Sequence, residues 1–130
     1  MIVPRWISPL FWVAAAYDGV LGLVFLAAPG WAFTRFDVTP PNHMGYVQFP
    51  AALLIVFGLI FVAIARDPVA CRGMIVYGVL LKLAYCSVTS YYWLTTDIPV
   101  IWKPFVVIDL VMGILFVVAY IVLPRTTERG

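Results

Sequence analysis

The sequence predicts an all-α membrane protein, a transmembrane four-helix bundle, from its composition, segment lengths and pattern. Hydrophobic residues make up 65% and charged residues 11% of the 130 residues, against about 45–50% and about 25% in soluble domains. The mean hydropathy is +1.06. Four apolar stretches each approach the ~20 residues that a helix needs to cross a bilayer, and the alternation of membrane β-strands is not seen. We therefore expect one integral membrane domain over residues 1–130.

The first two expected spans are bounded by residues that end or begin helices. The first runs from about residue 9 to 28 and stops before Pro29, since proline does not continue a helix. The second runs from about 44 to 65 and follows Asn42, a residue type that caps helix N-termini. Pro50 lies inside this second span, where membrane helices tolerate a kink.

The third and fourth expected spans follow after a short charged turn that contains Arg66. The third covers about 74–94 and the fourth about 100–123, ending at Pro124. The connectors on either side of the third span are short.

The positions of lysine and arginine predict the orientation, because cytoplasmic loops carry an excess of these residues. Arg35 and Lys103 fall on one side of the membrane. Five arginines fall on the other side: Arg5, Arg66, Arg72, Arg125 and Arg129. We therefore expect both termini in the cytoplasm.

One connector, residues 29–43, is longer than the others and rich in aromatic residues. Trp31, Phe33 and Phe36 surround Arg35, a composition typical of a segment that lies at the membrane interface. The segment either lies on the outer interface or covers the mouth of the bundle.

Three charged residues fall inside the expected spans: Asp18, Lys82 and Asp109. A charge at a helix centre costs at least ~2.5–3.5 kcal/mol, so such residues usually pair or have a function. A rise of 1.5 Å per residue places Asp18 and Lys82 at one depth and Asp109 about 6–8 Å nearer the outside. We expect an Asp18–Lys82 pair with Asp109 in reach and a space between Lys82 and Asp109.

Other polar residues point to the outer half of the same region. Gln48 lies near the expected depth of Asp109. A stripe on the third span follows the spacing of one helix face: Lys82, Tyr85, Cys86, Thr89 and Trp93. These residues predict a polar cleft that opens outward with Asp18 and Lys82 at its floor. The predicted ligand-binding residues are Asp18, Lys82, Asp109, Gln48, Tyr85 and Thr89.

Several other classes of function lack the residues that they need. His43 is the only histidine, so a transition-metal site would lack its usual partners; we expect no metal and no cofactor. Cys71 and Cys86 fall at different depths, which disfavours a disulfide. No basic run suggests a nucleic-acid partner. No catalytic motif is present, so the catalytic residues are unknown and a non-enzyme is favoured.

Short patches of the chain together resemble a known kind of protein. These patches are Tyr17-Asp18-Gly19-Val20-Leu21-Gly22, Gln48-Phe49-Pro50, Ala65-Arg66-Asp67-Pro68, Leu81-Lys82-Leu83 and Asp109-Leu110. They are similar to uncharacterised small bacterial four-span inner-membrane proteins of the DoxX-like kind. The resemblance implies a bacterial inner-membrane four-helix bundle and implies no particular activity.

Three functions remain open from the sequence. In the first, the protein lies in the lipid bilayer and its charged centre binds or passes a small polar or lipid-like ligand that enters the outward-opening cleft. In the second, the charges only fix helix pairing, and the chain is an accessory subunit of a membrane complex or a homo-oligomer. In the third, a carboxyl group acts as general acid–base in a lipid-modifying or isomerase-type enzyme.

Overall fold

The computed structural model describes residues 3–125, and all of its regular elements are helical. The elements are α1 (Ile7–Ala27), α2 (Pro29–Arg35), α3 (Gly45–Arg66), the 3₁₀ turn η1 (Arg72–Met74), α4 (Ile75–Thr95) and α5 (Trp102–Val122). Four of these helices, with η1 continuing into α4, are long and apolar enough to cross a membrane. The prediction of an all-helical chain with four apolar spans is confirmed.

The four long helices begin and end within two residues of the ranges expected from the sequence. The addition is α2, which occupies half of the connector between the first two spans. Pro29 is its first residue, a position where the missing N–H costs nothing because it would have no partner in the helix. Asp37 adopts a positive φ of 55° just after α2 and turns the chain toward α3.

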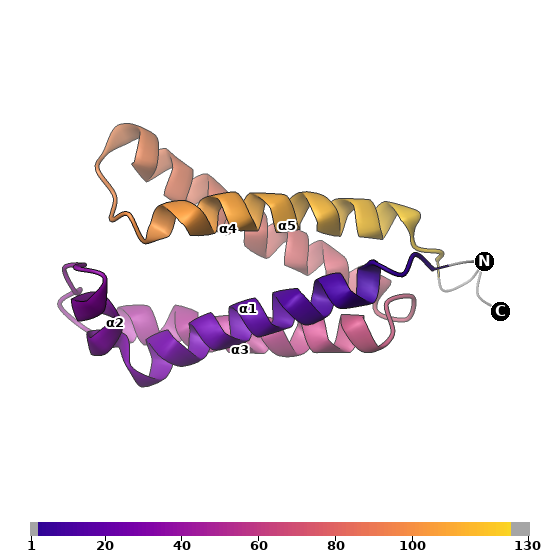
Figure 1. The fold of residues 1–130 in the computed structure, drawn as a ribbon, viewed down its shortest axis with the longest axis horizontal. Coiled ribbons are helices and arrows are strands. Elements are labelled where there is room, and N and C mark those ends of the chain that lie inside the picture. Colours follow the sequence, from indigo (N-terminus) through magenta and orange to yellow (C-terminus); the bar gives the residue numbers. More distant parts are fainter. Residues whose placement is uncertain (1–2, 126–130) are drawn as a thin grey trace.

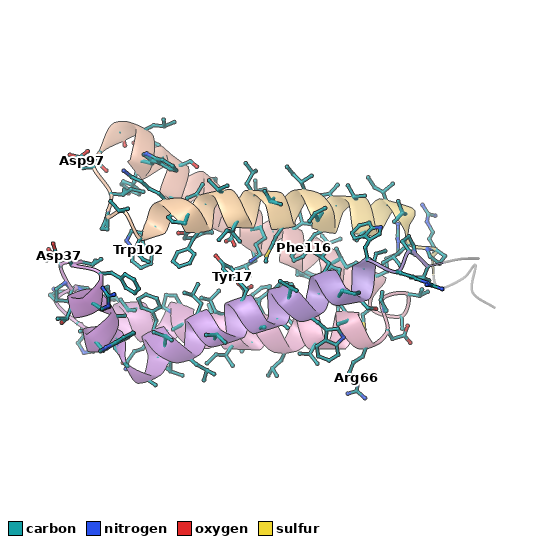
Figure 2. All side chains as sticks on the ribbon, in the orientation of Figure 1. Tyr17, Asp37, Arg66, Asp97, Trp102 and Phe116 are labelled. Carbon is teal, nitrogen blue, oxygen red and sulfur yellow. The ribbon has the colours of Figure 1, made fainter. Side chains whose placement is uncertain are left out.

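The long helices pack as two pairs, α1 with α3 and α4 with α5 (Figure 1). The start of α1 and the end of α5 lie at one end of the molecule, together with η1; we call it the terminal end. The opposite end holds α2 and the connection between α4 and α5, and we call it the α2 end. Arg66 lies toward the terminal end, whereas Asp37 and Asp97 lie at the α2 end (Figure 2). Arg129 lies outside the described residues.

Glycines bring α1 and α3 into close contact. A Cβ on Gly22 would lie 2.6 Å from the carbonyl oxygen of Ala51, and one on Gly58 would lie 3.3 Å from that of Ala15. Small residues at such crossings let two membrane helices approach until their backbones touch. The α1–α3 pair is therefore packed by backbone rather than by large side chains.

Three phenylalanines join the two helix pairs between the middle of the molecule and its terminal end. Phe11, Phe61 and Phe116, from α1, α3 and α5, are each 0% exposed. The rings of Phe11 and Phe116 stack with centroids 4.7 Å apart, and Phe61 lies 5.3 Å from Phe116. Gly78 of α4 faces these rings and has no room for a Cβ. All four spans therefore meet at this aromatic level.

Different side-chain contacts hold the elements together at the two ends of the molecule. At the terminal end, Nε of Arg72 donates a hydrogen bond to the carbonyl oxygen of Tyr120 at 3.0 Å, and its guanidinium lies over the Tyr120 ring. At the α2 end, Phe33 of α2 is buried and packs edge-on against Phe25 of α1. Trp31 remains exposed. Thus one face of α2 packs against α1, and the other presents an exposed aromatic residue.

Candidate functional site

The three charged residues within the spans meet at one point between the helix pairs. The ammonium of Lys82 donates to Oδ1 and Oδ2 of Asp18 at 3.1 and 3.3 Å and to Oδ1 of Asp109 at 3.0 Å. Asp18, Lys82 and Asp109 are 1%, 2% and 7% exposed. We call this group the charged centre. It links α1, α4 and α5, as the depth of each residue in its span suggested.

One expectation about the charged centre is wrong. Depth counting left a space between Lys82 and Asp109, but the ammonium contacts both carboxylates directly. A lysine side chain is long and flexible, so its ammonium can lie well away from the depth of its own Cα. Nothing therefore fits between Lys82 and Asp109.

Aromatic rings and a close backbone enclose the ammonium further. Its nitrogen lies 5.1 Å from the ring centroid of Tyr17 and 5.9 Å from that of Phe61, within the range of a cation–π interaction. A Cβ on Gly113 of α5 would lie 3.3 Å from the Cβ of Lys82. The Tyr17 hydroxyl, on the α1 face toward α5 (Figure 2), is buried. It has no hydrogen-bond partner within 3.5 Å among residues 3–125, but it interacts with the Asp109 carboxylate.

A cavity of about 400 Å³ extends from the charged centre toward the α2 end. Its floor carries Tyr17 and the three charged residues, and Tyr85 lies beside them. Most of the wall is apolar, with contributions from Leu21, Phe25, Ala51, Leu54, Trp102 and Phe105. The expected polar cleft is therefore corrected: the walls are apolar and the polarity is concentrated at the floor.

The mouth of the cavity lies between α3 and α4. Four lining residues are exposed and all belong to these helices: Tyr46, Pro50, Leu53 and Ala84. The lining residues from α1 and α5 are buried or half-buried. The two helices meet near the terminal end and diverge toward the α2 end (Figure 1). The mouth therefore lies between two candidate membrane spans.

The remaining predicted site residues have different surroundings. Tyr85 lines the cavity, and its hydroxyl donates to the carbonyl oxygen of Trp102 at 3.1 Å. Gln48 does not line the cavity; its Nε2 donates to the carbonyl oxygen of Leu26 at 3.2 Å and satisfies the end of α1. Thr89 lies one turn beyond Tyr85 and is not part of the wall. Gln48 and Thr89 therefore do not line the cavity, and their part in ligand binding stays a prediction.

The polar stripe of α4 divides between two sides of the helix. Tyr85 faces the cavity, whereas Sγ of Cys86 donates to the carbonyl oxygen of Val106 of α5 at 3.5 Å. Cys86, Lys82, Asp109 and Gly113 border a second, smaller hollow of about 150 Å³ between α4 and α5. Asp109 therefore borders both hollows.

The cysteines and the histidine have structural surroundings. Both cysteines are free thiols. Nδ1 of His43 accepts a hydrogen bond from the Gly45 N–H at 3.0 Å at the start of α3. Within residues 3–125, no group of three or more His, Cys, Asp or Glu side chains could hold a metal ion.

Sequence reasoning missed Tyr17 and the aromatic part of the wall. A signal was available for α1, because Leu21 and Phe25 follow Asp18 at three and seven residues and so share its helix face. The same signal was available for α5, because Phe105 and Trp102 precede Asp109 at four and seven residues and so share its helix face. Comparison with protein-family models, curated proteins and solved structures finds no match for this chain.

Proposed function

We propose that this protein binds a lipid-like ligand, with the chain of the ligand in the cavity and its polar end at the charged centre. The observation that carries the proposal is an apolar cavity that ends on buried charges and opens between two membrane helices. Its volume of about 400 Å³ lies within the range of about 300–1,000 Å³ typical of small-molecule sites. A mouth at the level of the hydrocarbon suits a ligand dissolved in the bilayer.

The setting that we propose is the inner membrane of a bacterium, with both termini in the cytoplasm. The arginines near the terminal end support this orientation through the excess of positive charge in cytoplasmic loops. In that orientation the cavity lies in the outer half of the membrane and the α2 end faces outward. A bacterial DoxX-like protein, of the kind that the sequence resembles, would have this setting.

A second candidate function is that of an accessory subunit whose charges only hold helices together. The observation that favours it is the completeness of the charged centre, because Lys82 has carboxylate partners without any ligand. Buried ion pairs of this kind can specify helix pairing rather than add stability. Specific binding of a ligand by the purified chain alone would separate the two candidates in favour of the first.

The test uses dodecyl chains that carry a photoreactive group and a hydroxyl, ammonium or sulfonate head, added to the protein in phosphatidylcholine vesicles. We expect at least one of these probes to label α3 and α4 beside the cavity in a saturable manner. Replacement of Ala84 by tryptophan places a large ring at the mouth. This variant should lower labelling about tenfold, equivalent to about 1.4 kcal/mol of binding free energy.

The matched control is Ala16→Trp, because Ala16 is exposed on α1 and does not line the cavity. It should leave labelling unchanged, and both variants should unfold at the temperature of the unmodified protein. If no probe labels the cavity saturably, or if Ala84→Trp and Ala16→Trp behave alike, the cavity is not a ligand site.

A further inference from the structure

The ammonium of Lys82, the one positive charge at the cavity, is already occupied. It contacts three carboxylate oxygens from two residues, and the side chain is 2% exposed. An ammonium has three N–H donors and no acceptor. A lysine inside a membrane span would by itself suggest a site for an anion. Here the N–H donors of the ammonium already contact carboxylate oxygens, so few remain for a ligand that enters through the mouth.

Of the three charged residues that line the cavity, Asp109 has the most exposed side chain. Its side chain is 10% exposed, against 2% for those of Asp18 and Lys82. Lys82 holds both oxygens of Asp18 but only Oδ1 of Asp109. Both Asp109 and Lys82 also border the second hollow, between α4 and α5. The Tyr17 hydroxyl at the floor also interacts with the Asp109 carboxylate. A carboxylate has about four lone-pair sites, so Asp109 can still accept a hydrogen bond from a ligand.

The balance of charge at the floor points in the same direction. The cavity is lined by two carboxyl groups and one ammonium and by no other ionisable acid or base of the Asp, Glu, Lys, Arg or His type among the described residues. With both carboxylates ionised, one negative charge is uncompensated, and a net charge in such surroundings is costly. A proton or a ligand group with a positive or partly positive hydrogen would balance it, whereas an anion would add to the excess.

On these grounds, and resting on the proposed function of the cavity, we propose that the polar head of the ligand is a hydrogen-bond donor, an alcohol or an amine, that binds the Asp109 carboxylate. The site then selects against acids, phosphates and sulfonates. The chain of the ligand lies against the apolar wall, including Phe25, Leu54 and Phe105. The head group, rather than the chain, is what this site recognises.

The test compares four dodecyl compounds as competitors of whichever photoreactive probe labels the cavity, at equal mole fraction in phosphatidylcholine vesicles and neutral pH. The compounds are the alcohol, the amine, the methyl ether, which lacks a donor, and the sulfonate, which is an anion. We expect the alcohol, the amine or both to compete at least about tenfold better than the ether and the sulfonate. A stronger effect of the amine identifies a cationic head, and equal effects identify donation alone as the requirement.

Asp109→Asn supplies an independent measurement. It keeps the shape of the side chain and removes its negative charge, so the charges of Asp18 and Lys82 cancel. The ratio by which the amine competes better than the sulfonate should therefore fall about tenfold. The matched control, Asp97→Asn, changes an exposed carboxylate at the α2 end and should leave the ranking as it was.

The proposal is overturned if the sulfonate competes as well as the alcohol and the amine, or if all four compounds compete equally. Either result would leave the cavity as a ligand site, because competition itself shows binding. Absence of saturable labelling by every probe would instead contradict the proposed function. The two failures are therefore distinguishable.

Discussion

Lys82 carries a charge that is almost completely buried, with 2% of the residue exposed. It lies among apolar helices, yet its ammonium is matched by two carboxylates and two aromatic rings. Removing one partner of a buried ion pair is costly, because the remaining charge keeps its desolvation penalty and loses its compensation. Here the loss of the lysine would leave two acidic groups facing each other across the helix pairs.

We therefore expect Lys82→Met to be strongly destabilising, by about 3–5 kcal/mol, the usual cost of breaking a buried pair. The variant Asp18→Asn, Lys82→Met, Asp109→Asn removes all three charges and should recover a large part of this loss. The measurement is thermal unfolding of the purified protein in detergent, followed by the loss of the monodisperse species.

Lys103→Met is the matched control for this prediction. The Lys103 ammonium lies 5.6 Å from the centroid of the Trp93 ring, a contact worth about 0.5–1 kcal/mol at an accessible site. If Lys82→Met unfolded no earlier than Lys103→Met, the charged centre would contribute nothing to assembly, contrary to its burial.

The geometry of the elements depends on where glycine stands as much as on where large residues stand. Gly22 and Gly19 lie one turn apart on α1, but only a Cβ added at Gly22 would point into the α3 backbone. A Cβ at Gly22 would lie 2.6 Å from the Ala51 carbonyl oxygen and 2.9 Å from Cγ1 of Ile55. Backbone cannot move aside as a side-chain end can, so this contact fixes the separation of the two helices.

Gly22→Ala is therefore expected to destabilise the protein by about 1–3 kcal/mol, the usual cost of overpacking. Gly19→Ala is the matched control, since nothing lies within 4 Å of its added Cβ. It should be neutral or add up to about 0.5–1 kcal/mol, because alanine is the better helix former. Thermal unfolding of both variants in one detergent decides the matter, and equal effects would contradict the close α1–α3 contact.

The sequence was sufficient for the long helices and for the meeting of Asp18, Lys82 and Asp109, because apolar length and the cost of buried charge act locally. It was not sufficient for α2, since residues 29–35 are too short for a span and fold against Phe25 only in the assembled chain. The surroundings of Gln48 could not be predicted for a similar reason. Its depth in the span is close to that of the site, but its position around the α3 axis turns its side chain toward Leu26. Depth can be counted from sequence, whereas helix rotation depends on packing.

At the scale of the whole molecule, the cavity results from joining two helix pairs at one level only. On the terminal-end side of Lys82, Phe11, Phe61 and Phe116 fill the space between the two helix pairs. On the α2-end side, α4 inclines away from α3 (Figure 1), and the cavity wall is open where Leu53 and Ala84 are exposed. The closed half of the molecule thus supports the charged centre, and the open half gives access to it.

The proposed orientation gives a prediction for the protein in its membrane. With Cys71 and Cys86 replaced by alanine, single cysteines can be placed at Ala70, near η1, and at Thr96, at the α2 end, both of which are exposed. Because the arginines near the terminal end favour the cytoplasm, a membrane-impermeant maleimide added to intact bacterial spheroplasts should label Thr96→Cys. Ala70→Cys should react only after permeabilisation, and the cysteine-free parent should not react at all.

Two results would contradict this orientation. Labelling of Ala70→Cys alone in intact spheroplasts would mean the reverse orientation and would place the mouth of the cavity in the inner half of the membrane. Equal labelling of Ala70→Cys and Thr96→Cys would mean that the arginines do not fix one orientation.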